Sequence, residues 1–240
     1  MILSLALKRH RRGEIKHFQR KKLESHLKTR FLKEINDEKE EINHPNQGTT
    51  EHIIRRENGS KEEEHKQNTF TKVKSTSDIF KDVEGNQTRI VLTIGEAGIG
   101  KSFHMRKFIK EWAKPVELLF LIDFSKLNST KNKKISLFEL LNHFFEETKN
   151  IIICDYSQLN ILFLLDGLDA YQHCLDFENN EILTDVREPT SIDVLLTNLI
   201  RGNLLPEAKV WITSQPPAAE KIPDGIIDRL TEIRGKICRC

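Results

Sequence analysis

Residues 90–102 read IVLTIGEAGIGKS, and this stretch is the strongest indication of the fold in the sequence. Its first five residues, IVLTI, are apolar or β-branched without polar alternation, which is typical of a strand buried on both faces of a parallel sheet. The next eight, GEAGIGKS, fit the pattern GxxxxGK[ST] at every specified position. Behind them, apolar residues recur at helical spacing, namely Met105, Phe108, Ile109 and Trp112, and Lys114-Pro115 predicts the helix end. The stretch therefore predicts a strand, a phosphate-binding loop and a helix in direct succession.

The predicted loop supplies the groups that bind a polyphosphate. Its glycines let the backbone approach a phosphate with N–H groups pointing inward, and the helix N-terminus adds about half a positive charge there. We expect Lys101 to reach the phosphates of ATP or ADP and the Ser102 hydroxyl to bind Mg²⁺. The alternative is a glycine-rich turn that only connects strand to helix. Such a turn does not require a Lys-Ser pair at this position, so the pair favours phosphate binding. The predicted nucleotide-binding residues are Gly95, Glu96, Ala97, Gly98, Ile99, Gly100, Lys101 and Ser102.

Polar residues follow two further apolar runs. In ILFLLDGLD (161–169), Asp166 follows five apolar residues and is expected at the carboxyl edge of the sheet, where ligands bind. Because a phosphate loop needs an acidic partner for Mg²⁺, we interpret Asp166 as that ligand, whereas the role of Asp169 depends on geometry. The run KVWIT (209–213) leads into Ser214-Gln215. Either Thr213, Ser214 or Gln215 senses the γ-phosphate or the strand simply exits into a loop, and the sequence favours neither.

The region from residue 88 onward alternates short apolar runs with helical patterns. The runs are IVLTI (90–94), LLFLI (118–122), ILFLLD (161–166) and KVWIT (209–213). Between them, Ser136-Leu-Phe-Glu139 is a capping box that predicts a helix start. A further helix is expected from Ser191 to a stop at Gly202. This alternation predicts an α/β fold, a P-loop NTPase with a doubly wound parallel sheet, behind a helical or disordered N-terminal arm.

Charge is unevenly distributed ahead of this domain. Residues 1–33 contain eleven Lys or Arg and two Glu, whereas residues 34–64 are mainly acidic, so the net charge of +2 hides the asymmetry. Apolar residues between the basic ones favour a solvated amphipathic helical segment over residues 1–42, and this disfavours a nucleic acid partner. Residues 43–76 contain few large apolar residues, and we assign 43–87 as a polar linker. Residues 88–240 form the predicted nucleotide-binding domain.

Several features bear on the compartment. No apolar run approaches the eighteen residues that a membrane span needs, and the opening MILSLALKRH lacks the features of a signal peptide. The four cysteines form no paired CxxC pattern, so we interpret them as reduced thiols. We therefore expect a soluble, cytoplasmic protein.

The chain resembles the NACHT domain of NOD-like receptors, most closely the expanded set found in fish, in five successive segments: GEAGIGKS, FIKEWA, NKKISLFELLNHFF, LFLLDGLD and TSIDVLLTNLIRGNLLPEAKVWITSQPPAA. The resemblance covers nearly all of residues 88–235. Upstream, SDIFK (77–81) and, more loosely, KKLESHLKTRF (21–31) resemble the fish-specific NACHT-associated segment.

The resemblance implies an ADP/ATP switch in innate immune signalling. Such receptors are inactive with ADP, exchange nucleotide after sensing a signal, and oligomerise through the NACHT domain, so other NACHT proteins are the implied partners. The resemblance also implies roles for single residues: Gly98, Gly100, Lys101 and Ser102 bind phosphate and Mg²⁺, Asp166 holds Mg²⁺, and Asp169 belongs to the catalytic acidic pair.

The sequence departs from the family pattern in three ways. Ala170 stands where a second acidic residue is usual, and Gln215 stands where the TSRP motif usually has Arg. The chain also stops at Cys240, without the helical and winged-helix subdomains, the repeat region or a recognisable death-fold domain. Arginine fingers accelerate phosphoryl transfer by roughly 10³ to 10⁵, so a missing arginine favours nucleotide binding over hydrolysis.

Three interpretations follow. The first is a regulatory nucleotide switch with, at most, slow ATPase activity, and the intact phosphate loop favours it. The second is a truncated, hydrolysis-impaired NACHT decoy or adaptor that interacts with full-length receptors, and the departures favour it. An unrelated P-loop kinase or nucleic acid ATPase has only the generic motif and the basic N-terminus in its favour.

Overall fold

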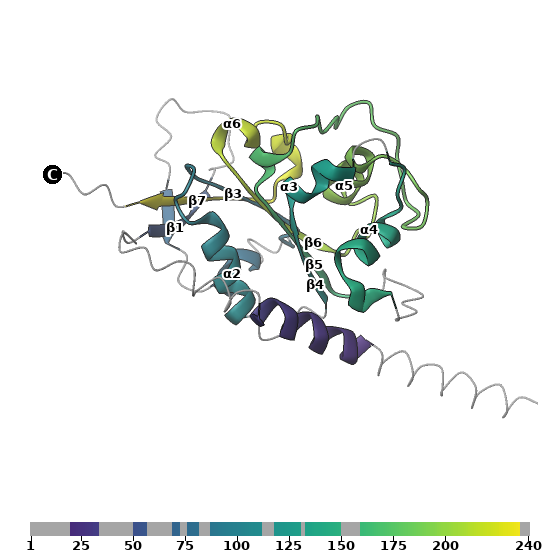
Figure 1. Ribbon diagram of the computed structural model, residues 1–240. Coiled ribbons are helices and arrows are strands. Elements are labelled where there is room, and N and C mark those ends of the chain that lie inside the picture. Colours follow the sequence, from purple (N-terminus) through teal and green to yellow (C-terminus); the bar gives the residue numbers. More distant parts are fainter. Residues whose placement is uncertain are drawn as a thin grey trace, which may run out of the picture.

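The structure is a computed structural model that describes residues 20–33, 50–56, 69–72, 76–81, 87–111, 118–130, 133–149 and 159–235. Its centre is a seven-stranded sheet in the order β2-β1-β7-β3-β6-β5-β4 (Figure 1). The strands are β1 Thr50–Arg56, β2 Thr69–Lys72, β3 Ile90–Ile94, β4 Leu118–Asp123, β5 Ile161–Asp166, β6 Lys209–Ser214 and β7 Arg229–Gly235.

Helices cover both faces of the sheet. Figure 1 shows α2 (Lys101–Glu111) on one face and α4 (Leu137–Phe144) and α5 (Ile192–Arg201) on the other. Short helices lie in the connections: α3 Phe124–Leu127, α6 Pro216–Ala219, η1 Thr76–Phe80, η2 Asn128–Thr130, η3 Glu146–Thr148, η5 Leu168–Ala170 and η6 Asp224–Ile226. Within the described ranges, no helix is both long and apolar enough to cross a membrane.

Five neighbouring strands, β7, β3, β6, β5 and β4, pair in parallel, which confirms the predicted α/β P-loop fold. Every residue of β3 and the first five of β5 are buried, because helices cover both faces of the sheet. The register pairs Ile94 with Ser214 and Asp123 with Asp166. The carboxyl ends of these strands therefore meet at one edge, and the predicted site residues follow them there.

Two antiparallel strands extend this sheet beyond the predicted domain. β1 pairs with β7, and β2 pairs with β1. Both lie in residues 43–87, where the sequence predicted a polar linker without strands, and β7 itself was not expected. Of the β1 side chains that the structure describes, Ile53 is buried. The pairing uses mainly backbone groups, which cover the edge that β7 would otherwise expose.

The predicted helix signals are confirmed where the structure describes them. α4 has a capping box in which the Ser136 hydroxyl accepts from Glu139 N–H, and the Glu139 carboxylate accepts from Ser136 N–H. α5 ends at Gly202, whose φ of 86° is the left-handed conformation that glycine favours. Trp112 and the Lys114-Pro115 stop lie outside the described residues.

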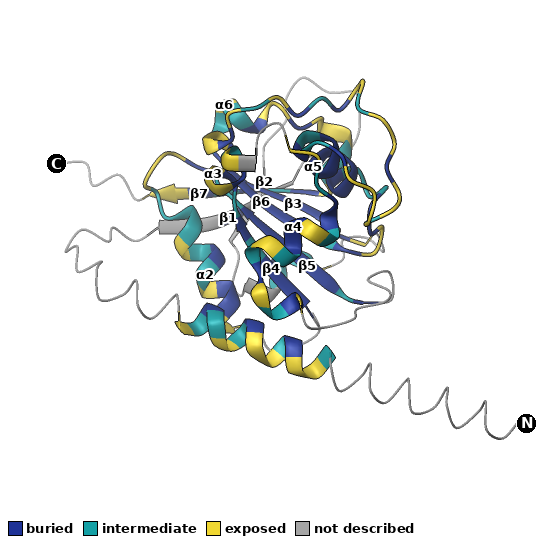
Figure 2. Ribbon diagram, turned by 45° about the vertical axis from the view of Figure 1, so that its right-hand side comes forward, coloured by how far each residue is buried: buried dark blue, intermediate teal, exposed yellow. Residues whose placement is uncertain are grey.

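The N-terminal helix (residues 20–33) belongs to the predicted amphipathic segment and packs against the domain. Its side chains Leu23, Leu27 and Phe31 are buried in the common core, whereas half of its Lys and Arg residues are exposed and the other half are partly buried (Figure 2). The Phe31 ring meets Phe145 edge-on, at 6.1 Å between centroids. The Arg30 guanidinium lies over the Phe145 ring and donates to the Phe144 carbonyl at 3.0 Å. The helix is therefore part of the folded body.

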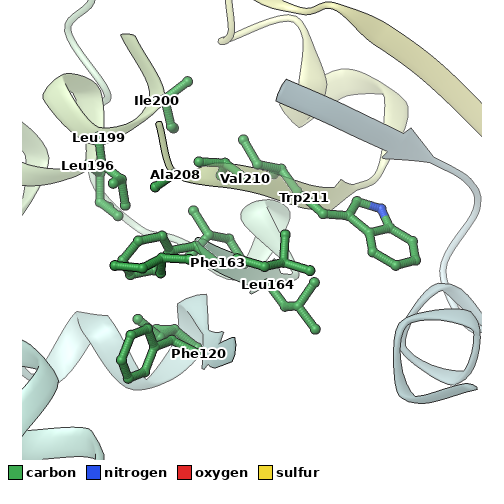
Figure 3. Packing of buried hydrophobic residues seen from close by; sticks show 14 of the residues in the cluster. Phe120, Phe163, Leu164, Leu196, Leu199, Ile200, Ala208, Val210 and Trp211 are labelled. Carbon is green, nitrogen blue, oxygen red and sulfur yellow. The ribbon is translucent and has the colours of Figure 1, made fainter. Parts of the chain in front are cut away.

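The core joins aromatic rings from both sheet faces, and Figure 3 shows part of it. Trp211 of β6 is 0% exposed, and its indole N–H donates to the Thr93 hydroxyl at 2.7 Å. On the α2 side, the Phe108 ring packs against Trp211 at 5.3 Å. Near β4, Phe120 packs against Phe163 at 5.5 Å. The indole N–H thus has its partner inside the sheet, as a buried donor requires.

Replacing Leu27 by Ala should lower the free energy of unfolding by roughly 2–5 kcal/mol, because the buried side chain leaves a cavity. Leu27 is 0% exposed. Urea unfolding followed by tryptophan fluorescence measures the change. His26→Ala on the exposed side of the same helix is the control and should stay within about 0.5 kcal/mol of wild type. Equal stabilities for both variants would mean that the helix lies outside the cooperative fold.

Candidate functional site

The phosphate loop (residues 95–102) has the backbone that its glycines permit. Gly98 and Gly100 have φ values of 73° and 104°, in the left-handed region where side chains are strained. A Cβ on Gly95 would lie 2.9 Å from Ile99 Cγ2 and 3.1 Å from the Ile233 carbonyl oxygen. The start of the loop is therefore packed tightly between its own residue Ile99 and Ile233 of β7. Glycine is needed at these three positions for geometric reasons.

Lys101 lies back over this loop. Its ammonium group donates to the carbonyl oxygens of Gly95, at 2.7 Å, and of Glu96, at 2.9 Å. Partial burial lowers the pKa of Lys101, while the charges of Asp169, Asp166 and Glu96 oppose that shift. The structure thus brings the predicted lysine and both predicted acids into one electrostatic neighbourhood. Ser102 follows in the first turn of α2 and is half-buried.

Asp166 is oriented by a hydroxyl from the adjacent strand. Thr213 Oγ1 donates to Asp166 Oδ1 at 2.5 Å, and the same hydroxyl accepts from Gly167 N–H at 2.8 Å. Gly167 has a φ of 76°, so the chain turns sharply directly after the acid. Thr213, whose role the sequence left open, therefore fixes the direction of the Asp166 carboxylate.

Asp169 is held by the other residue that the sequence left open. Gln215 donates its backbone N–H to Asp169 Oδ1 at 3.0 Å and its side-chain amide to Oδ2 at 2.8 Å. Both carboxylate oxygens of the predicted catalytic residue are thus engaged by one glutamine. Ser214 donates its hydroxyl to the Gln215 carbonyl at 2.9 Å. Sensing of a γ-phosphate by any of these residues stays a prediction.

Asn128, which no sequence pattern singled out, binds the backbone of the turn that follows Asp169 (residues 170–172). Its amide nitrogen donates to the Ala170 carbonyl at 2.9 Å, and its Oδ1 accepts from Gln172 N–H at 3.0 Å. Asn128 lies where α3 ends, far from Asp169 in the sequence, and its pattern there is that of a glycosylation sequon. No local signal in the sequence indicates that the Asn128 side chain makes these two hydrogen bonds.

Asp123 is a second residue that the sequence analysis missed. It ends β4 directly beside Asp166 in the parallel register. Its carboxylate caps α3 by accepting from Ser125 N–H at 2.8 Å. The signal was present, since LLFLID (118–123) has the same pattern of apolar residues followed by Asp as ILFLLD (161–166).

Replacing Thr213 by Val should destabilise the fold by roughly 1–3 kcal/mol, because Gly167 N–H and Asp166 Oδ1 lose their shared partner at nearly constant side-chain volume. Chemical denaturation gives the change in free energy. Thr213→Ser keeps the hydroxyl and should restore most of the loss. A Val variant as stable as wild type would contradict this account of the site, because it would mean that the two hydrogen bonds of the Thr213 hydroxyl contribute nothing to stability.

Known proteins share this domain. The family model described as NACHT domain matches residues 89–235, close to the predicted domain start. The chain is 40% identical to Protein NLRC3 of Mus musculus over 152 residues, which is 61% of this chain and 14% of that protein.

Other relatives align over a similar length. The chain is 35% identical to NACHT, LRR and PYD domains-containing protein 3 of Rattus norvegicus over 137 residues, 53% of this chain and 13% of that protein. It is 28% identical to NLR family member X1 of Rattus norvegicus over 159 residues, 64% of this chain and 16% of that protein. The chain therefore spans a small part of the curated relatives that it matches. Because the family model covers more than half of the 240 residues, the chain belongs to the NACHT domain family.

Proposed function

We propose that this chain binds ATP and ADP with Mg²⁺ on the phosphate loop and that the bound nucleotide controls a regulatory switch in innate immune signalling. The position of Lys101 carries the proposal. Its ammonium lies on loop carbonyl oxygens, at 2.7 and 2.9 Å, with Asp166 and Asp169 close enough to influence its pKa. An ammonium group on a glycine loop, within electrostatic reach of the strand-end Asp166 and of Asp169 in η5, suits a phosphate chain that is bridged to Mg²⁺.

The residues present fit such a ligand. The left-handed glycines Gly98 and Gly100 open the loop backbone, and the N-terminus of α2 presents N–H groups that lack intrahelical acceptors. Lys101 would exchange its bonds to the loop carbonyls for bonds to phosphate oxygens. The proposed Mg²⁺ ligands are the Ser102 hydroxyl and an oxygen of Asp166, since Mg²⁺ takes one or two protein oxygens beside the phosphates. When bound, Mg²⁺ neutralises charge on those phosphates.

The site is better suited to binding a nucleotide than to hydrolysing it. We assign Asp169 as the residue that orients an attacking water, but both of its oxygens accept hydrogen bonds from Gln215. Ala170, the next residue, supplies no second carboxylate. Gln215 is also neutral where an arginine would supply positive charge to the γ-phosphate. We therefore propose a long-lived nucleotide complex in which any ATPase activity is slow.

The switch itself rests on the family. The relative NACHT, LRR and PYD domains-containing protein 3 of Rattus norvegicus carries, by its name, LRR and PYD domains beside its NACHT domain. We propose that nucleotide exchange controls assembly of this chain with itself or with other NACHT proteins in the cytoplasm. Assignment to the fish-type subset stays a prediction.

A second candidate function is a hydrolysis-impaired decoy or adaptor that pairs with full-length NACHT receptors and binds nucleotide weakly or not at all. The bond between Asp169 and Gln215 favours it, because a carboxylate with both oxygens engaged is a poor general base. Nucleotide content separates the two candidates.

The purified protein should release close to one ADP or ATP per chain on denaturation. Lys101→Ala should weaken binding by roughly 2–5 kcal/mol, or about 30-fold and more, because the phosphates lose their charged partner. The control is Lys107→Ala, an exposed lysine on the same helix that pairs with Glu111 at 3.8 Å. Chromatography of the released nucleotide gives the result. Empty wild-type protein that also fails to bind added Mg-ATP would favour the decoy.

Asp166→Asn should change the Mg²⁺ dependence while leaving Mg²⁺-free binding of ADP intact. The amide keeps an oxygen for the Thr213 hydroxyl but removes the charge that attracts the ion. We expect the Mg²⁺ concentration needed for half-maximal ATP binding to rise roughly tenfold or more. Titration calorimetry at several Mg²⁺ concentrations measures it, with the exposed Asp224→Asn as control. An unchanged Mg²⁺ dependence would remove Asp166 from the metal site.

A further inference from the structure

Phe103 is an exposed aromatic side chain at the mouth of the phosphate loop. It directly follows Ser102 and lies in the first turn of α2. Its exposed fraction is 51%, and among the described residues the other exposed large hydrophobic side chain is Ile182, at 75%. Single exposed hydrophobic residues are common on protein surfaces, so the position of Phe103, and not its exposure alone, gives it meaning.

The direction of the Phe103 ring follows from the helix. α2 buries Met105, Phe108 and Ile109 against the sheet. A residue two positions before Met105 lies about 200° around the helix from it, so the Phe103 side chain points away from the sheet. Its backbone N–H is one of the three that precede the first hydrogen bond of α2, from His104 N–H to the Gly100 carbonyl, and such N–H groups at a helix start are the ones that bind phosphate. The same residue thus borders the phosphates with its backbone and the solvent with its ring.

A nucleotide bound here would bring its base to this ring. The phosphates occupy the loop and the helix N-terminus, while the sheet and the buried face of α2 fill the space behind them. The nucleoside is attached to the α-phosphate and has to leave the loop on the solvent side, past the first turn of α2. The exposed ring of Phe103 is the apolar surface on that side.

The surroundings of the ring suit a flat partner. Phe103 meets the His104 ring edge-on, with centroids 5.8 Å apart and an interplanar angle of 88°. The edge contact leaves a face of the Phe103 ring available for offset stacking, the geometry that aromatic pairs prefer.

We infer that Phe103 stacks on the nucleobase of the bound nucleotide and is its main protein contact within the described residues. This inference rests on the proposed function, which supplies the nucleotide. Base stacking on aromatic side chains tolerates different bases, because every base has a π-face. Phe103 should therefore contribute affinity for nucleosides in general, and it should prefer purines because they offer the larger ring.

The test measures two probes on the full chain by titration calorimetry. ADP carries a base, whereas inorganic tripolyphosphate offers only the phosphate chain. The variants are Phe103→Ala, Phe103→Leu, which keeps apolar area without a π-face, and Phe103→Trp, which enlarges the ring. Ile182→Ala is the matched control, since it removes the other exposed large hydrophobic side chain of the described residues. Thermal unfolding verifies that each variant is folded.

Stacking predicts that Phe103→Ala and Phe103→Leu weaken ADP binding roughly 5- to 100-fold, while Phe103→Trp keeps or improves it. Tripolyphosphate affinity and the Ile182→Ala protein should match wild type. ADP affinity that is unchanged in Phe103→Ala would overturn the inference, as would equal losses for ADP and tripolyphosphate, which would mean that the ring shapes the loop. If the wild type binds neither probe, the proposed function fails first.

Discussion

Parallel, in-register pairing of β3, β6 and β5 is the constraint on which the rest of the structure depends. Because these strands end at one edge, three hydrogen bonds can cross between their ends: Gly95 N–H to the Ser214 carbonyl, Thr213 to Asp166, and Gln215 to Asp169. Each bond joins residues that are far apart in the sequence. A slip of one residue in β6 would turn Thr213 to the other face and separate it from Asp166. The residues of the candidate site therefore come together at this edge only in the observed register of β3, β6 and β5.

Much of the fold could be predicted because its signals are local. The strands IVLTI, LLFLI, ILFLLD and KVWIT are apolar on both faces, and this pattern has one stable solution, a sheet covered by helices. The capping box at Ser136 and the stop at Gly202 bind or turn the backbone of their own helices, so their residue types suffice. The phosphate loop could be predicted for the same reason, because the glycines, Lys101 and Ser102 that form it are contiguous in the sequence.

The remaining features depend on partners distant in the sequence. β1 and β2 carry little apolar pattern, and they form because β7 offers backbone groups to pair with. From the sequence, Gln215 was notable because it replaces the usual arginine of the TSRP motif, whereas in the fold its side-chain amide donates to Asp169. Asn128 holds the acidic turn through the backbone of Ala170 and Gln172, which no side-chain pattern reveals. Such contacts follow from the completed sheet, so a sequence pattern cannot specify them in advance.

The central claim is that the loop from residue 95 to residue 102 is a nucleotide site. Hydrogen–deuterium exchange of the whole protein, with and without Mg-ADP, tests it most directly because it reports on backbone amides. Bound Mg-ADP should slow exchange in peptides covering residues 95–104, where amides would donate to phosphate, and should give smaller protection around Asp166. Exchange that is unchanged in the loop at saturating Mg-ADP, or protection confined to the N-terminal helix, would mean that the loop binds no nucleotide.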